Sequence, residues 1–163
     1  MSGVEVVYAD PEPRMAQAVD VDSSDPNFQE IVCTEGIYTG QVDPASGLFH
    51  GIGRLRSPDT MAEGEWRNGK LHGQGSQMWQ DGRRYVGSFV AGDFSGRGRM
   101  EWQHPRGKMV YEGEYLNDRK HGEGTFVWPS GKAYEGQWVD GRREGIGVDI
   151  TAAGVRCKGA WSD

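Results

Sequence analysis

The sequence predicts an all-β protein, an elongated, twisted antiparallel ribbon of stacked β-hairpins with five repeats and a C-terminal half repeat. A short motif recurs every 23 to 26 residues, and its first glycines are Gly40, Gly64, Gly87, Gly113, Gly136 and Gly159. Within each copy, aromatic residues and glycines alternate with polar residues, which is the period of a β-strand. A repeat of this length is typical of stacked arrays, in which each unit buries its apolar face only against its neighbours.

The first 35 residues differ from the rest of the chain in charge. They hold eight acidic residues and one base, Arg14, whereas residues 36–163 hold 16 acidic and 17 basic residues. We therefore divide the chain into an acidic segment, 1–35, and a nearly neutral repeat array, 36–163. We expect the acidic segment to be partly disordered or partner-bound. Our hypothesis is that 27–35 caps the first hairpin and that 1–25 fold onto a partner.

The repeat that begins at Tyr134 illustrates why each copy is predicted to be a hairpin. Tyr134, Gly136 and Trp138 alternate with polar residues and so share one face of a strand. Asp140-Gly141 is a strong signal for a tight turn, because glycine supplies the positive φ that such turns need. The returning strand is expected to begin at the Gly-x-Gly pair, Gly145 to Gly147.

One aromatic residue of each repeat is expected to align with its counterparts when the repeats stack. The glycines on the same face leave bare backbone, across which a neighbouring ring can lie flat. We interpret this row as core rather than as a platform that stacks sugars or bases, because cross-strand aromatic pairs stabilise sheets. The row comprises Trp66, Phe89, Tyr115, Trp138 and Trp161.

The motif resembles the MORN repeat (membrane occupation and recognition nexus). The similarity is closest in 111–126, Y-E-G-E-Y-L-N-D-R-K-H-G-E-G-T-F, and in 63–75, E-G-E-W-R-N-G-K-L-H-G-Q-G. Some copies depart from the pattern: Val42 replaces the tryptophan of the first, and Ser95 and Glu144 replace the histidine of the third and fifth. The sixth copy stops after one strand, at Cys157-Lys158-Gly159-Ala160-Trp161.

The resemblance implies a ribbon without enzymatic activity of its own. Relatives of this kind act as scaffolds in axonemes and other cytoskeletal assemblies, so we expect a non-enzymatic adaptor for protein partners, cytoplasmic and most specifically ciliary or flagellar. An alternative is a membrane tether that binds acidic phospholipids. A third is a regulatory module of a larger enzyme, since some relatives carry such repeats beside lipid kinase or methyltransferase domains.

No cofactor or metal site is expected. His50, His72 and His121 recur before the Gly-x-Gly pairs, but equivalent atoms two strands apart are separated by about 9–10 Å, too far to share zinc. A hydrogen bond that stabilises the turn is the preferred interpretation. Cys33 and Cys157 flank five repeats and so lie about 45–50 Å apart, which excludes a disulfide within the chain.

Basic residues recur at similar places in the repeats and are the candidate partner-binding positions. They could dock an acidic protein segment or anionic lipid, although the default interpretation is a solvated face. The nearly neutral array argues against nucleic acid, which favours a basic excess. The unpaired last strand also suggests edge-to-edge self-association. The candidates are Arg97, Arg99, Arg106, Lys108, Arg119, Lys120, Arg142 and Arg143.

Overall fold

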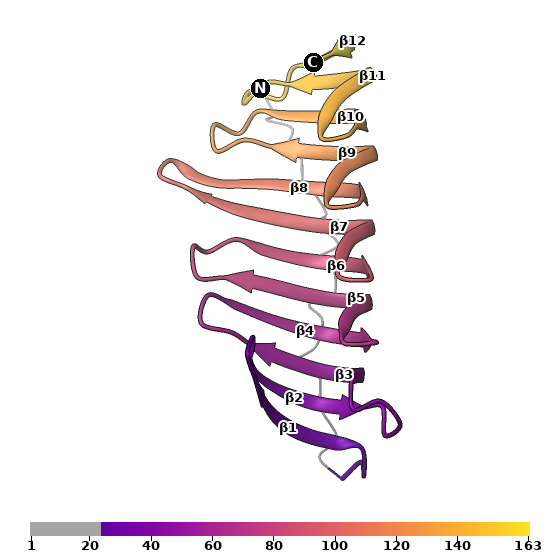
Figure 1. The fold of residues 1–163 in the computed structure, drawn as a ribbon. Coiled ribbons are helices and arrows are strands. Elements are labelled where there is room, and N and C mark those ends of the chain that lie inside the picture. Colours follow the sequence, from indigo (N-terminus) through magenta and orange to yellow (C-terminus); the bar gives the residue numbers. More distant parts are fainter. Residues whose placement is uncertain (1–23) are drawn as a thin grey trace.

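The repeats stack into a single open sheet. The structure, a computed structural model, describes residues 24–163, so the hypothesis for 1–25 falls almost wholly outside it. Twelve antiparallel strands follow one another in sequence order, from β1 at one end to β12 at the other (Figure 1). The described residues contain no helix, and hence none long and apolar enough to cross a membrane. The predicted all-β ribbon of stacked hairpins is confirmed.

The strands are six to twelve residues long. Their bounds are β1 Phe28–Cys33, β2 Gly36–Val42, β3 Phe49–Arg56, β4 Thr60–Arg67, β5 Lys70–Trp79, β6 Arg84–Val90, β7 Asp93–His104, β8 Gly107–Leu116, β9 Arg119–Val127, β10 Ala133–Val139, β11 Arg142–Ile150 and β12 Arg156–Ser162. The segment 27–35, hypothesised to cap the array, contributes β1, which pairs with β2 along its whole length.

Tight turns join the two strands of a repeat. Asp140 and Gly141 have φ angles of 50° and 87°, and Asn68 and Gly69 have 51° and 78°. Two consecutive positive φ angles define the primed turn whose twist matches that of the flanking strands. The third repeat uses Ala91 at φ 53°, a conformation that a residue with a Cβ adopts at a cost.

The returning strand begins earlier than the sequence suggested. β11 starts at Arg142, three residues before the Gly-x-Gly pair, because the strand passes through a bulge rather than starting there. Gly145 in this bulge has φ 71°, and the Gln137 side chain accepts a hydrogen bond from the Ile146 amide at 3.0 Å. Such a bulge adds residues to one strand and bends it.

Tyrosine rings lie across the glycines of the next strand. The Tyr85 hydroxyl donates to the Ser88 carbonyl at 3.0 Å, and a Cβ placed on Gly98 would lie 2.2 Å from that hydroxyl. The first, fourth and fifth repeats use Tyr38, Tyr111 and Tyr134 in the same way. Glycine is therefore required at these positions because the ring occupies the space of a side chain.

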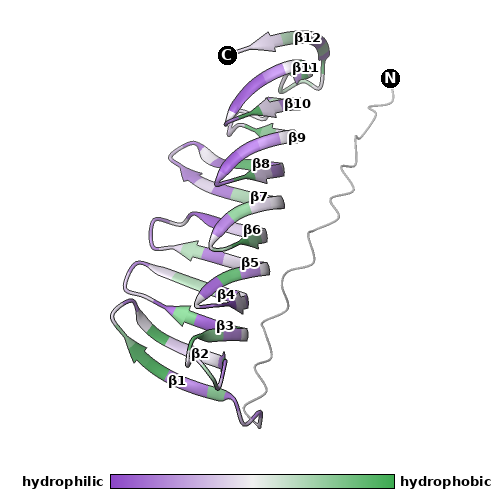
Figure 2. Ribbon diagram, turned by 45° about the vertical axis from the view of Figure 1, so that its right-hand side comes forward, coloured by the Kyte–Doolittle hydropathy of each residue, from purple (hydrophilic) through white to green (hydrophobic). Residues whose placement is uncertain are grey.

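The bulges fold each hairpin so that rings from its two ends meet. Tyr38 and Phe49 lie on opposite sides of the bulge in the first repeat, yet their rings stack with centroids 3.8 Å apart. Tyr85 and Phe94 do the same in the third repeat at 3.9 Å. The strands accordingly curve in Figure 2. We call the side that carries these rings the ring face, and the other side of the sheet the opposite face.

Candidate interaction surfaces

The aromatic row predicted from the sequence lies in the core of the ring face. Trp66, Phe89, Tyr115 and Trp138 are buried, and Trp161 packs against them partly exposed. The Trp138 ring stands edge-on between Tyr111 and Tyr134, with centroids 5.3 and 5.4 Å away. Its indole nitrogen donates to the Gly124 carbonyl at 3.1 Å. With their faces covered in this way, the four buried rings have no free surface on which a ligand could stack.

The residue that pairs with Val42, Trp66, Phe89, Tyr115 or Trp138 across the hairpin changes character along the array. The first three repeats place Phe49, Leu71 and Phe94 there, whereas the fourth and fifth place Lys120 and Arg143. Phe49 and Phe94 stack on tyrosine rings and Leu71 is buried in the same core, so a cation at this position is unexpected. The side chains of Lys120 and Arg143 therefore belong to the ring face, not to a surface shared with the other basic candidates.

Lys120 is held among rings. Its ammonium lies 4.3 Å from the Trp138 ring centroid, 4.7 Å from that of Phe126 and 5.6 Å from that of Tyr111. Burial lowers the pKa of Lys120, since removing the ammonium from water disfavours its charged form. No carboxylate lies within ion-pair distance of it among residues 24–163.

Arg143 lies over the rings of Tyr134 and Trp161 at 5.4 and 5.5 Å. Unlike Lys120, it also forms ion pairs, with Asp163 and with Asp149 at 3.8 Å. It thereby ties the last strand to the fifth repeat. This position contributes to stability rather than to an exposed basic patch.

Three more basic candidates are paired with acids. Arg99 contacts Glu112 at 3.1 Å and Glu101 at 3.3 Å, and Lys108 contacts Glu101 at 3.0 Å. Arg119 lies 3.8 Å from Asp140. The remaining candidates, Arg97, Arg106 and Arg142, are exposed.

An apolar row crosses the opposite face near the longer loops. Strand register places one residue of every strand in it, and most are aliphatic or methionine. Val32, Ile37 and Val127 are the most exposed of these, at 80%, 43% and 36%. In order the row runs Val32, Ile37, Arg56, Met61, Met78, Arg84, Glu101, Val110, Val127, Ala133, Ile150 and Arg156.

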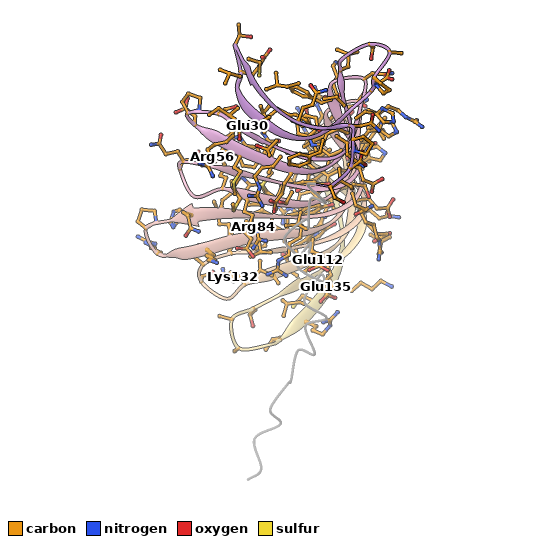
Figure 3. All side chains as sticks on the ribbon, turned by 90° about the horizontal axis from the view of Figure 1, so that it is seen from below. Glu30, Arg56, Arg84, Glu112, Lys132 and Glu135 are labelled. Atoms are coloured by element: carbon orange, nitrogen blue, oxygen red, sulfur yellow. The ribbon has the colours of Figure 1, made fainter. Side chains whose placement is uncertain are left out.

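A second, more polar row runs beside the apolar one, two residues along each strand. Acids and bases on neighbouring strands pair in it, as Arg54 does with Glu63 at 3.0 Å. Among the charged residues labelled in Figure 3, Glu30, Glu112 and Glu135 belong to this row. The row runs Glu30, Thr39, Arg54, Glu63, Ser76, Val86, Arg99, Glu112, Thr125, Glu135, Val148 and Lys158.

Sequence reasoning did not identify these two rows, although the alternation of residues along each strand contained the signal. The positions that alternate with the ring-face residues were expected to form a solvated face. Which of them become neighbours depends on the register between strands, which the sequence does not show. At the β1 end both rows border a shallow hollow lined by Glu30, Ile37, Thr39, Arg54 and Arg56. The opposite face is therefore patterned rather than uniformly polar.

The histidines and cysteines form no metal cluster within 24–163. His72 accepts a hydrogen bond from the Ala91 amide at 3.3 Å, so this histidine braces the turn of the next repeat. His121 is different, because its Nδ1 is buried with no partner in the described part of the chain. Both cysteines are free thiols.

The fold defines a class of protein: a solenoid of β-hairpins that offers long surfaces and, among the described residues, no assembled catalytic group. The family model described as MORN repeat matches residues 45–61, 63–83, 85–103, 111–133 and 134–148. The chain belongs to the MORN repeat family. Repeats of this family are generally non-enzymatic scaffolds that mediate protein or lipid interactions.

Proposed function

We propose that this chain is a scaffold that docks protein partners, and that it does not act as a tether to acidic lipid. The observation that carries this proposal is the pairing of its basic residues. Arg99, Lys108, Arg119 and Arg143 have carboxylate neighbours, and the Lys120 ammonium points into the rings. Attachment to anionic membranes usually requires clusters of four to eight basic residues, at about 1 kcal/mol each.

The opposite face has the composition of a protein-binding surface. The apolar row there is interrupted by charged residues but exposes Val32, Ile37 and Val127, and the parallel row beside it carries paired charges. Apolar surface bordered by polar groups marks protein interfaces. An elongated partner lying across the strands would contact equivalent positions of successive repeats.

Affinity purification with matched variants tests this surface. Ile37→Glu and Val127→Glu together place two charges in the apolar row, and Val90→Glu places the same charge on an exposed valine outside it. We expect specific partners to be retained by the wild-type chain and by Val90→Glu and lost from the double variant. Equal recovery by all three would contradict docking on this face.

Vesicle co-sedimentation tests the alternative. We expect no salt-sensitive binding to vesicles that contain phosphatidylserine and phosphoinositide, compared with neutral vesicles. Binding that Arg142→Glu with Arg106→Glu abolishes would instead favour the lipid tether, because these two are among the exposed basic candidates without an ion pair in residues 24–163.

We further propose that the scaffold serves a cytoskeletal assembly in the cytoplasm, most specifically a ciliary or flagellar axoneme. This part rests on the family resemblance alone. A fluorescently tagged chain expressed in ciliated cells should remain in the axoneme after detergent extraction. A diffuse signal lost on extraction would contradict it.

A further inference from the structure

The terminal strands β1 and β12 each have one hydrogen-bonded neighbour among the described residues. An edge strand presents unpaired N–H and C=O groups and is a template for another strand. We propose that β12 of one copy pairs antiparallel with β1 of a second copy, so that copies of this chain join head to tail. This inference does not depend on which partner the opposite face binds.

The two ends are complementary in strand type. Even-numbered strands carry the tyrosine position, and the odd-numbered strands β3 to β11 carry the Gly-x-Gly pair. β1 occupies the place of an odd-numbered strand: Ile31 pairs with Tyr38 as Phe126 pairs with Tyr134, and Gln29 pairs with Gly40 as Gly124 pairs with Gly136. Because the described array ends on an even-numbered strand, β1 of a second copy continues the alternation.

The interior register specifies the contacts at such a junction. In the fifth repeat Gly136 lies opposite Gly147 and Tyr134 opposite Asp149. Applied to β12, this register places Gly159 opposite Gln29 of the second copy, Lys158 opposite Glu30, and Cys157 opposite Ile31. Cys157 and Ile31 would then share the ring face, and Lys158 and Glu30 the opposite face.

Two departures from the repeat make room for this pairing. Elsewhere a tyrosine ring lies over the following strand and requires a glycine there. For example, a Cβ added to Gly147 would lie 2.4 Å from the Tyr134 ring. β1 has Gln29 in the glycine position, but β12 has Cys157 in place of the tyrosine. On the β2 side, Val42 replaces the tryptophan, so the two rings that cover the equivalent glycine in other repeats are absent at Gln29. The Trp161 ring lies against Gly159 of its own strand and beside Tyr134 and Arg143.

The charges also match. Glu30 and Lys158 are exposed, and neither forms an ion pair with the described residues. Both belong to the polar row, in which Arg54–Glu63 and Arg99–Glu112 already pair across neighbouring strands at 3.0 and 3.1 Å. A junction of β12 with β1 repeats that arrangement, whereas antiparallel pairing of β12 with another β12 joins two basic strands.

Sedimentation velocity of the full 163-residue chain over a range of concentrations tests the proposal. We expect wild-type protein to form species that grow with concentration beyond dimers. Lys158→Glu or Glu30→Lys alone should weaken association at least about tenfold, since each places like charges in contact, and combining both should restore it. Lys132→Glu, the same charge change in the exposed β9–β10 loop, should leave association unchanged.

Disulfide cross-linking between engineered cysteines tests the register directly. In a Cys33→Ala background, Ile31→Cys places a thiol opposite Cys157 of the neighbouring copy, and mild oxidation should give a ladder of cross-linked chains on a non-reducing gel. Val32→Cys in the same background points to the other face and should give no ladder. The two cysteines of one chain lie at opposite ends of the sheet and cannot react with each other.

Three results would overturn the proposal. The first is wild-type protein that stays monomeric at every concentration and gives no ladder. The second is association that stops at dimers, which indicates a symmetric interface instead. The third is association that Lys158→Glu and Glu30→Lys both leave unchanged. Circular dichroism of each variant establishes that it is folded before the comparison is made.

Discussion

The ammonium of Lys120 lies 4.3 Å from the centroid of the Trp138 ring, in a place where earlier repeats hold phenylalanine or leucine. Two effects oppose each other there. The ring faces attract the cation, and loss of water disfavours it. Burial lowers the pKa of Lys120, and no carboxylate among residues 24–163 offsets that loss of water, so we expect the loss of water to outweigh the attraction to the rings.

Replacing Lys120 by methionine should stabilise the protein at pH 7 by about 0.5–1 kcal/mol, because methionine keeps the apolar stem and removes the charge. The folded pKa lies below the unfolded value near 10.4, so the charge destabilises the wild type fully at low pH and progressively less as the pH approaches 10.4. Urea unfolding should therefore show a smaller difference in the free energy of unfolding between variant and wild type at pH 10 than at pH 7.

Arg119→Met is the matched control for that variant. Arg119 precedes Lys120 on the same strand but is exposed. Its replacement should change the free energy of unfolding by less than about 0.5 kcal/mol, as is usual for surface sites. A destabilised Lys120→Met would mean that attraction to the rings outweighs the loss of water.

Alkaline pH should destabilise the array through its tyrosines. Burial raises the pKa of Tyr38, Tyr85 and Tyr111 above the ordinary value of about 10. Their contribution to stability is fully present below pH 10 and is lost as the pH rises further, since the unfolded chain then releases protons that the folded chain retains. Each tyrosine contributes a slope of up to about 1.4 kcal/mol per pH unit.

Urea unfolding followed by tryptophan fluorescence at pH 9, 10, 11 and 11.5 measures that slope. Tyr85→Phe should reduce this slope by the equivalent of about one proton, or about 1.4 kcal/mol per pH unit, whatever the variant's stability at neutral pH. An unchanged slope in Tyr85→Phe would show that Tyr85 ionises in the folded state as it does in the unfolded chain.

Two equivalent glycines should tolerate alanine very differently. A Cβ on Gly98 would lie 2.2 Å from the hydroxyl of Tyr85, which is on the preceding strand. Gly75 occupies the equivalent place in the second repeat, where the preceding strand has Ala62 instead of a tyrosine. The nearest atom to a Cβ on Gly75 is the Glu63 carbonyl oxygen at 2.9 Å. Gly98→Ala should therefore cost about 2 kcal/mol more than Gly75→Ala in urea unfolding. Equal costs would argue against the ring as the reason for glycine.

A substitution in the tight turn of the third repeat, between β6 and β7, should stabilise the protein. Ala91 has φ 53°, in the region where asparagine and glycine are favoured, and the equivalent residue of the second repeat is Asn68. Ala91→Asn should raise the free energy of unfolding by about 0.5–1 kcal/mol. Ala153→Asn, in an exposed loop, serves as the control and should have little effect. A neutral Ala91→Asn would mean that the turn relaxes around the alanine at no cost.

Much of the fold was predictable from sequence because its signals are local and repeated. Alternation of aromatic and polar residues identifies the strands, and Asn68-Gly69 or Asp140-Gly141 the turns. The spacing of the glycines then implies stacking. Strand starts were misjudged because a bulge is invisible in an alternating pattern: its extra residues oppose a single residue on the partner strand.

The sequence by itself determined the repeat, its family resemblance and the face on which the rings lie, since each depends on residues close together in the chain. Only the tertiary structure decided that Lys120 and Arg143 lie among rings, and that residues of twelve strands line up as an apolar and a polar row. The physical reason is register. Which side chains become neighbours across strands depends on where each bulge shifts the pairing, and that shift depends on contacts between strands.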